Sequence, residues 1–390
     1  MRKSYFMWGI LWLSAFALAG CAKSQATETG ETTKVEETTK AEAASANSSA
    51  ASDYEINVGY YNCDHMVAGP VGEAAGIYKA HNLNVKLTGN GKVPQAMAAG
   101  QMDAGYIGAR GLVAANGEGS PIVYAANNHI GGSMYLVVAN DIEKPEDIYH
   151  QKVAMSDPST SESWLAGYSQ TLNLSSDPAD YELIQTGSDS DSFLALSTGQ
   201  IKAYTCCDPW GSMAEFNKVG KIMGTYYEMD GAMGICCGFA LNKNFIKEHH
   251  DLAVELLKAH QDSIKYIYEH PKKAAEIFAK YYNVPYEVSL MTIYKKCNAE
   301  GRTLTWQLNE EEFNHAYDVY KKFNLIKNLP DKEEVIERDI YNEASLDDFE
   351  EFIKNNVEKD DQKDHCPYIR LKAAFSVFLK YLLFRGHLKN

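Results

Sequence analysis

Apolar residues recur with two different spacings along the chain from residue 54 onward. Alternating or short continuous apolar runs predict strands, whereas apolar residues three and four positions apart predict helices. The predicted strands span residues 54–61, 83–87, 104–107, 122–126, 134–139, 152–155, 181–185 and 203–206. The predicted helices between them span residues 69–80, 94–100, 162–172, 190–198 and 209–219. After a short apolar run at residues 238–241, the pattern is helical from Lys243 to about Asn356.

Strands that alternate with helices predict an α/β fold, in which helices cover both faces of a parallel or mixed sheet. The alternation occurs in two successive units, and the helical region follows them. About 300 residues of ordinary globular composition are enough for two domains of typical size. We therefore expect two lobes with a ligand cleft between them and a helical C-terminal return.

The N-terminus has the pattern of an exported protein. Arg2 and Lys3 precede an apolar run over residues 5–19, and the run leads into Leu18-Ala-Gly-Cys21. This is the layout of a signal peptide, and its last four residues resemble the lipobox of bacterial lipoproteins. The resemblance implies that residues 1–20 are removed and that Cys21 is lipidated. The mature protein is then lipid-anchored on the extracytoplasmic face of the cell membrane.

Both ends of the chain differ in composition from the body. Residues 22–52 consist mainly of Ala, Ser, Thr, Glu, Lys and Gln. Such a segment buries too little apolar surface to offset its ordering entropy, so we expect residues 21–52 to form a disordered tether. Residues 357–390 are first acidic and then basic and amphipathic, which is typical of a helix on a membrane surface. A helix packed on the first lobe and a non-native extension remain alternatives for this tail.

The net charge restricts the classes of partner. The chain carries 37 basic and 52 acidic residues, a net charge of −15, and removal of Arg2 and Lys3 makes it −17. An acidic body without a basic run argues against nucleic acid and against adsorption on anionic lipid. A small anionic ligand is compatible with it, because the local field of a pocket can oppose the net charge. Beyond the signal peptide, no stretch reaches the roughly 18 apolar residues that a membrane span requires.

The cysteines do not form an obvious disulfide framework. If Cys21 is lipidated, an odd number remains, and two pairs are sequence neighbours, which is an awkward spacing for a disulfide. The remaining ones are Cys63, Cys206, Cys207, Cys236, Cys237, Cys297 and Cys366. We expect most of them to be free thiols.

A metal site has weaker support. The Cys-x-x-Cys spacing of zinc sites is absent. Neighbouring residues on a strand point to opposite faces, so we expect each adjacent pair to offer at most one thiol to a shared site. We predict no metal, and the alternative is a set that converges near the hinge: Cys63, His65, Cys206 and Cys236.

Candidate ligand-binding residues follow the predicted strands, because α/β folds bind ligands at the carboxyl ends of their strands. Asp64 and His65 follow the first strand, and Arg110, a potential bidentate partner for an oxyanion, follows the third. Asn128 and His129 belong to a polar connector at residues 127–133 between two apolar strands. The alternatives are a solvated helix start for His65 and a surface position for Arg110.

The second unit contributes two further candidate groups. Ser159, Thr160 and Ser161 precede a helix, whose free N–H groups together with the hydroxyls suit an anion; simple N-capping is the alternative. Asp208 and Trp210 follow the strand at 203–206. We expect Trp210 to stack on the ligand, and the alternative is a buried core residue.

Four segments in order resemble a known family, the substrate-binding proteins of ABC importers of the nitrate, sulfonate and taurine type. The first is Ala74-Ala-Gly-Ile-Tyr-Lys-Ala-His-Asn-Leu-Asn-Val85, and the second is Gln95-Ala-Met-Ala-Ala-Gly-Gln-Met-Asp-Ala-Gly105. The third runs from Lys144-Pro-Glu-Asp-Ile148 to Lys152-Val-Ala154, and the fourth is Leu196-Ser-Thr-Gly-Gln-Ile-Lys-Ala203. This family shares its fold with the thiamine-pyrimidine synthases.

The resemblance implies a periplasmic-binding-protein-like fold of type II. Residues 54–140 plus 241–356 would form the first lobe and residues 145–237 the second, with a hinge near 140–145 and 237–241. It implies a monomeric receptor without a cofactor, which captures a small solute and delivers it to the permease of its ABC importer. A sulfonate, nitrate or a heterocycle-like solute, in most cases anionic, is the implied ligand.

Two other classes of function remain alternatives. In the thiamine-pyrimidine synthases a functional His occupies a place comparable to His65, so an enzyme with His65 and thiols as reacting groups is the first. A metal-binding protein that uses the Cys and His residues at the hinge is the second. The chain has no nucleophile-elbow motif, phosphate loop or dinucleotide-binding turn, so we expect no enzyme of those types.

Overall fold

A computed structural model describes residues 53–89, 92–131, 134–155, 161–225, 228–229 and 232–357. The signal peptide, Cys21, the tether, Ser159, Thr160 and the tail from residue 358 lie outside the described residues, as does the side chain of Ser161. The described residues belong to one compact unit. Among them, no helix combines the length and the apolar character that crossing a membrane demands.

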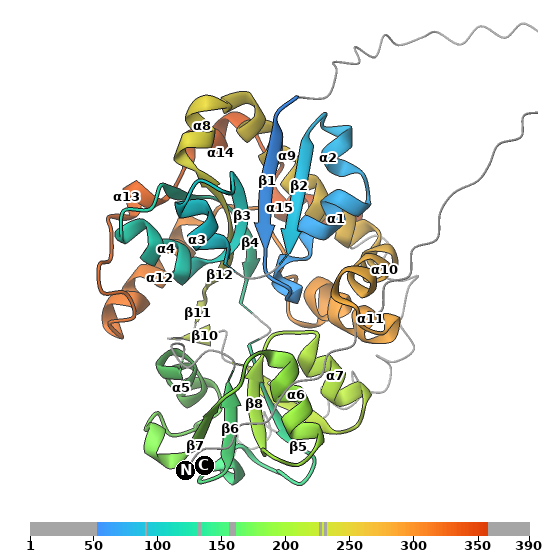
Figure 1. Ribbon diagram of the computed structural model, residues 1–390, viewed down its shortest axis with the longest axis vertical. Coiled ribbons are helices and arrows are strands. Elements are labelled where there is room, and N and C mark those ends of the chain that lie inside the picture. Colours follow the sequence, from blue (N-terminus) through green and yellow to red (C-terminus); the bar gives the residue numbers. More distant parts are fainter. Residues whose placement is uncertain are drawn as a thin grey trace, which may run out of the picture. The chain divides into compact units, whose positions relative to one another are not determined.

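The first lobe is built on a five-stranded mixed sheet with the order β2-β1-β3-β12-β4 (Figure 1). Its strands are β1 (Glu55–Tyr60), β2 (Asn84–Gly89), β3 (Ala104–Gly108), β4 (Ile122–Ile130) and β12 (Ile235–Asn242). β1 pairs in parallel with β2 and β3, whereas β12 is antiparallel to both β3 and β4. The carboxyl ends of the parallel strands therefore lie on one edge of this sheet, where the predicted site residues begin.

The side chain of Asp103, just before β3, forms two hydrogen bonds to residues of the β1 region. Its carboxylate accepts a 2.8 Å hydrogen bond from the amide N–H of Asn57 and a 2.9 Å bond from the hydroxyl of Tyr54. These bonds join the beginning of β3 to β1, so the turn that precedes β3 sets the position of the strand.

Short helices connect the strands of the first lobe. They are α1 (Ala68–Ala74), α2 (Ile77–Ala80), α3 (Val93–Ala98) and α4 (Ala109–Gly117). The single helix predicted at 69–80 is two helices, because Gly76 adopts a left-handed conformation with φ of 76° and interrupts it. The sequence pattern did not predict α4.

The second lobe is built on a second mixed sheet with the order β7-β6-β8-β5-β9. Its strands are β5 (Tyr135–Ala139), β6 (Lys152–Met155), β7 (Glu182–Gln185), β8 (Ala203–Cys206) and β9 (Gly220–Thr225). Its helices are α5 (Ser161–Thr171), α6 (Asp189–Ser197) and α7 (Trp210–Phe216), and a small hairpin consists of β10 (Glu228–Met229) and β11 (Ala232–Met233). Short 3-10 turns occupy Pro145–Ile148 and Pro178–Asp180.

The chain changes sheets at two places. β4 belongs to the first sheet and β5 to the second, so the chain passes between them after Ile130 and before Tyr135. It returns between Thr225, the end of β9, and Ile235, the start of β12. Both passages precede the positions expected for the hinge, and β5 lies in the second lobe although it was expected in the first.

The C-terminal region adds helices to the first lobe, as the pattern indicated. The first of these helices are α8 (Lys243–Glu248), α9 (His250–Glu269), α10 (Pro271–Tyr282), α11 (Tyr286–Tyr294) and α12 (Glu310–Lys322). Short helices follow: α13 (Lys332–Val335), α14 (Arg338–Ala344) and α15 (Phe349–Phe352). Two π-helical turns, η5 (Lys295–Ala299) and η6 (Ile353–Val357), continue α11 and α15.

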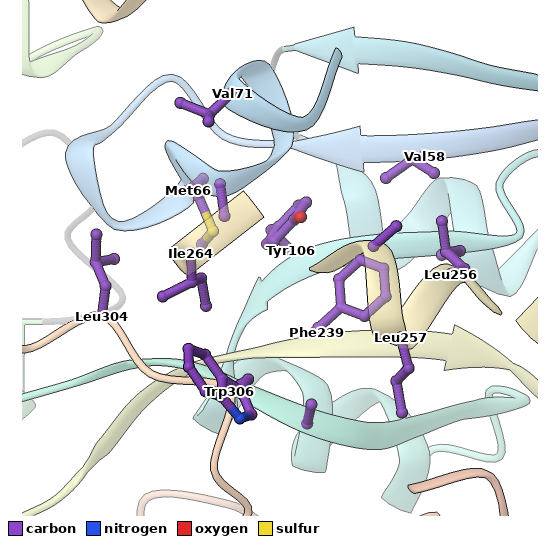
Figure 2. Packing of buried hydrophobic residues seen from close by; sticks show 14 of the residues in the cluster. Val58, Met66, Val71, Tyr106, Phe239, Leu256, Leu257, Ile264, Leu304 and Trp306 are labelled. Carbon is purple, nitrogen blue, oxygen red and sulfur yellow. The ribbon is translucent and has the colours of Figure 1, made fainter. Parts of the chain in front are cut away.

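The main core of the first lobe lies between its sheet and these helices. Figure 2 shows Tyr106 of β3 and Phe239 of β12 beside Leu256 and Leu257 of α9, all of them fully buried. Met66, from the turn after β1, belongs to the same cluster. Truncation of one such aromatic residue typically costs about 3–5 kcal/mol. The turn that carries Asp64 and His65 is thus fixed by the core beneath it.

Candidate functional site

The turns that follow β1 and β8 meet at the boundary between the two lobes. The turn after β1 is a 3-10 turn, η1 (Asp64–Met66), and Asp208 lies in the turn after β8. The amide N–H of Asp64 donates a hydrogen bond to the carbonyl oxygen of Asp208 over 3.1 Å. Both aspartate side chains are fully buried. The structure therefore brings together two predicted site residues from different lobes.

A buried lysine neutralises the first of these aspartates. Lys296, on η5, is 0 % exposed, and its Nζ lies 3.0 Å from Oδ2 of Asp64 and 2.8 Å from Oε2 of Glu300. Burial alone would lower the pKa of Lys296, but the carboxylates of Asp64 and Glu300 outweigh it and raise the pKa. Burial likewise opposes ionisation of Glu300, yet Lys296 and Lys295 lower its pKa to about 2. Tyr135 of the second lobe donates its hydroxyl to Glu300.

A second ion pair, unlike the first, joins residues of the two lobes. Nζ of Lys295 lies 3.2 Å from Oδ2 of Asp208 and 2.8 Å from the hydroxyl of Ser212. Ser212, in α7, donates its amide N–H and its hydroxyl to Asp208, each over 2.8 Å. Asp208 is therefore held by groups of both lobes, since Lys295 belongs to the first lobe and Ser212 to the second. Fixed buried charges of this kind are costly unless they are paired, as they are here.

Two histidines stack beside these ion pairs. The rings of His65 and His129 are nearly parallel, with centroids 4.0 Å apart, and both residues are buried. Nζ of Lys296 donates to Nε2 of His129 over 3.3 Å, so the neutral ring carries its proton on Nδ1. Burial, His65 and Lys296 together lower the pKa of His129 to about 3. His129 is therefore neutral, and the polar site contains one uncharged imidazole.

His129 and Asn128 are strand residues. The connector predicted at 127–133 is wrong for residues 127–130, because β4 continues to Ile130 and pairs with β12. These polar residues pair within the sheet because their side chains find buried partners. Asn128, for example, donates its side-chain amide to the carbonyl oxygen of His65 over 2.6 Å.

The adjacent thiols of β12 both face His65. The Sγ atoms of Cys236 and Cys237 lie 3.4 and 3.7 Å from Nδ1 of His65, and 3.4 Å from each other. The expectation that the pair would offer one thiol is wrong, because the register of β12 shifts on both sides of Cys237. A bulge of this kind interrupts the alternation of side chains between faces.

The thiols of Cys236 and Cys237 and the ring of His65 change one another's pKa values. The hydrogen bond from Cys237, together with the imidazoles of His65 and His129, lowers the pKa of Cys236 well below its ordinary value. Burial alone would lower the pKa of His65, but the Cys236 and Asp64 anions raise it to about 10. These opposite shifts favour a thiolate on Cys236 and an imidazolium on His65.

A second group of thiols spans the two lobes. Ligand atoms of Cys63, His65 and Cys207 all lie within 4.8 Å of one another. The hydrogen bond from Cys207 and the charge of His65 lower the pKa of Cys63. Cys206, expected in the alternative metal set, points instead into the core of the second lobe, because adjacent residues after a regular strand face opposite ways. The neighbouring thiol, Cys207, takes its place.

The two remaining predicted residues, Arg110 and Trp210, lie at the starts of helices. Arg110 is in the first turn of α4, and its charge acts on Tyr320 of α12. Trp210 begins α7, where its ring packs on Phe193 with centroids 5.9 Å apart. A ligand contact for Trp210 or Arg110 stays a prediction.

Sequence reasoning missed Lys295, Lys296 and Glu300. Lys296 and Glu300 are spaced like an ordinary exposed ion pair of a helix. The only local signal is the pair of adjacent lysines at the end of an apolar helical stretch, which is a common surface pattern. Lys295 and Glu300 contact Asp208 and Tyr135 of the second lobe, and the helical pattern does not indicate such contacts.

Two α/β lobes that meet through strand-end turns define the fold class of periplasmic substrate-binding proteins. The chain matches the NMT1/THI5-like family over residues 65–274 and belongs to that family. No curated protein sequence matches the chain.

Solved structures share the fold at low sequence identity. A zinc-bound ligand-binding component of an ABC-type import system from Staphylococcus aureus is 17% identical, with a TM-score of 0.61, covering 74% of this chain and 98% of that chain. The nitrate-binding protein NrtA from Synechocystis PCC 6803 is 13% identical, with a TM-score of 0.61, over 78% of this chain and 91% of that one. The aliphatic sulphonate-binding protein SsuA from Escherichia coli is 16% identical, with a TM-score of 0.59, over 73% and 92%.

Proposed function

We propose that the protein is the solute receptor of an ABC importer, anchored outside the cytoplasmic membrane through a lipid on Cys21. It captures a small sulfonate-, nitrate- or heterocycle-like solute between its lobes and delivers it to the permease. The family and the shared fold with nitrate- and sulphonate-binding proteins support this class. The observation that carries the proposal is the set of paired, buried charges where the two lobes meet, around Asp64, Asp208 and Lys296.

These charges suit a receptor because they join the lobes through polar contacts. Lys295 reaches Asp208 and Tyr135 reaches Glu300, each across the boundary. Polar contacts can exchange with water when the lobes part, whereas an apolar boundary would resist opening. A solute that binds only when both lobes contact it shifts the population toward the closed state.

The same charges bear on the class of solute. Asp64, Asp208, Glu300 and the Cys236 thiolate carry four negative charges, and Lys295, Lys296 and protonated His65 carry three positive ones. The cluster therefore has no surplus cation for an anionic solute. An anion would be held by hydrogen bonds, and the N–H groups at the start of α5 are the predicted donors.

A panel of solutes tests the proposal. The mature protein is heated with alkanesulfonates, nitrate or pyrimidines, and the melting temperature is measured. A solute at 100 times its Kd should add about 2.7 kcal/mol of stability and raise the melting temperature by several degrees. Asp208→Asn should weaken this shift, whereas Asp347→Asn, in an exposed ion pair of the first lobe, should leave it unchanged. Equal shifts in both variants would place the solute elsewhere.

An enzyme remains the second candidate because the opposite pKa shifts of Cys236 and His65 favour a thiolate beside an imidazolium, the usual form of a nucleophilic cysteine. A receptor returns its solute unchanged. Mass spectrometry of each solute after long incubation distinguishes the two: conversion that disappears in Cys236→Ser supports the enzyme, and unchanged solute supports the receptor.

A further inference from the structure

The thiols of Cys63 and Cys207 face each other from different lobes. Cys63 follows β1 of the first sheet, and Cys207 follows β8 of the second. One ligand atom of each lies within 4.8 Å of the other and of a ring nitrogen of His65. Both cysteines are free and partly exposed, whereas His65 is buried.

Neighbouring contacts fix the two turns that carry these thiols. The residues that directly follow them, Asp64 and Asp208, share the backbone hydrogen bond between the lobes. The carbonyl oxygen of Cys63 accepts a 3.0 Å hydrogen bond from the hydroxyl of Tyr282, and Sγ of Cys207 lies 3.3 Å from Sδ of Met134. The three donor atoms are thus held close together before any ion binds, which reduces the ordering cost of binding one.

The chemistry of the donors selects the ion. Two cysteine sulfurs and one imidazole, which release their protons when they bind a metal, favour Zn²⁺ or Cu⁺ and disfavour the hard ions Mg²⁺ and Ca²⁺, which prefer oxygen. Three protein ligands leave one position of a tetrahedral zinc ion open to water or to a donor atom of a solute.

We propose that Cys63, His65 and Cys207 bind one thiophilic metal ion and that this ion joins the two lobes. Cys207 lies on a different lobe from the other two ligands, so all three can bind the ion only when the lobes are together. The ion therefore favours the closed arrangement. The closure of the lobes by the ion rests on the proposed two-lobed receptor. Metal binding itself can be tested without any solute.

The second thiol group provides an internal comparison. Cys236 and Cys237 belong to the first lobe together with His65, so an ion held by those three would not depend on the second lobe. Removal of Cys207 separates the two possibilities.

Zinc titration of the mature protein under a thiol-free reductant tests the proposal. We expect one Zn²⁺ per chain, with affinity about 100-fold or more lower in Cys63→Ser and in Cys207→Ser, since each loses one of three ligands. Cys297→Ser, which changes a cysteine outside both groups, should bind zinc like the wild type. Circular dichroism of each variant confirms that it is folded. Cobalt replaces zinc as a second probe, and its thiolate charge-transfer absorption should weaken in both serine variants.

Small-angle scattering then tests closure. Zn²⁺ should reduce the radius of gyration of the wild type and of Cys236→Ser, and leave that of Cys207→Ser unchanged. Wild-type zinc affinity in folded Cys207→Ser, or its loss in Cys236→Ser alone, would overturn the proposal, as would the absence of zinc binding. If zinc binds as expected and no solute of the panel does, the metal site stands and the receptor function fails.

Discussion

Lys296 is the residue on which the charge balance of the site depends most directly. It is fully buried between two carboxylates, those of Asp64 and Glu300, and also donates to His129. Removal of one member of a buried ion pair leaves an uncompensated charge in a place from which water is excluded.

We therefore expect Lys296→Met to lower the free energy of unfolding by about 3–5 kcal/mol. Lys273→Met is the control, because Lys273 forms an exposed pair with Glu276 and its removal should leave the stability close to that of the wild type. Urea unfolding of both variants measures the difference. Equal stability of the two variants would mean that the buried network contributes nothing.

Two buried histidines make the fold sensitive to mild acid. Burial, with His65 and Lys296, lowers the pKa of His129 to about 3, and burial lowers that of His260 to about 4. Below the ordinary value of 6.5, the unfolded chain binds protons at these rings that the folded chain does not bind. The free energy of unfolding therefore falls as the pH falls, by up to about 1.4 kcal/mol per pH unit for each ring.

His129→Gln removes one of these rings and keeps an acceptor for Lys296. Between pH 6 and pH 4.5, its stability should decrease with acid less steeply than that of the wild type, by about 1.4 kcal/mol per pH unit. Denaturation curves at several pH values provide the measurement. An unchanged slope in His129→Gln would show that His129 is not held neutral.

At the scale of elements, the bulge in β12 decides which side chains reach the site. Cys237 lies opposite Gly108 of β3, and the register against β4 shifts on both sides of Cys237. Gly238 follows directly, and a Cβ on it would lie 2.2 Å from a ring carbon of Tyr124, which is fully buried. Glycine at this position lets the bulged strand approach β4 closely.

Gly238→Ala should therefore lower the free energy of unfolding by about 1–3 kcal/mol, because the added methyl overpacks a closed core. Gly108→Ala is the matched control on the neighbouring strand, since its Cβ would meet nothing within 4 Å. We expect that variant to stay within about 0.5 kcal/mol of the wild type. Thermal unfolding compares the two, and equal costs would show that the contact with Tyr124 relaxes freely.

The elements show why part of the fold was predictable. The bounds of β6 and β8 agree with prediction because each is a short apolar run between polar turns. β4 was predicted too short, because Asn127 to His129 are polar and yet buried. The bulge at Cys237 and the burial of Lys296 arise from packing between strands and between lobes, which local patterns do not contain. The strand-end rule located Asp64, His65 and Asp208, and it could not locate residues of the returning helices.

At the scale of the whole molecule, the first prediction is that a lipid on Cys21 holds the protein at the membrane. Cys21→Ala should move the protein from the membrane fraction to the soluble fraction, because the lipobox-like Leu18-Ala-Gly-Cys21 loses its lipid acceptor. Cys297→Ala should remain with the membrane. Fractionation followed by immunoblotting measures both. Retention of Cys21→Ala in the membrane would point to the amphipathic residues 367–384 as the anchor.

Capture of an unmodified solute between the lobes is the central claim, and native mass spectrometry tests it most directly. The protein is purified gently from its own cells and weighed before and after denaturation. We predict one small solute per chain, released with its mass unchanged on unfolding and absent from Asp208→Asn. An adduct that survives unfolding, or a released compound that the protein has chemically converted, would contradict a receptor. A wild-type protein that carries no solute, and that no solute of the test panel stabilises, would also contradict a receptor.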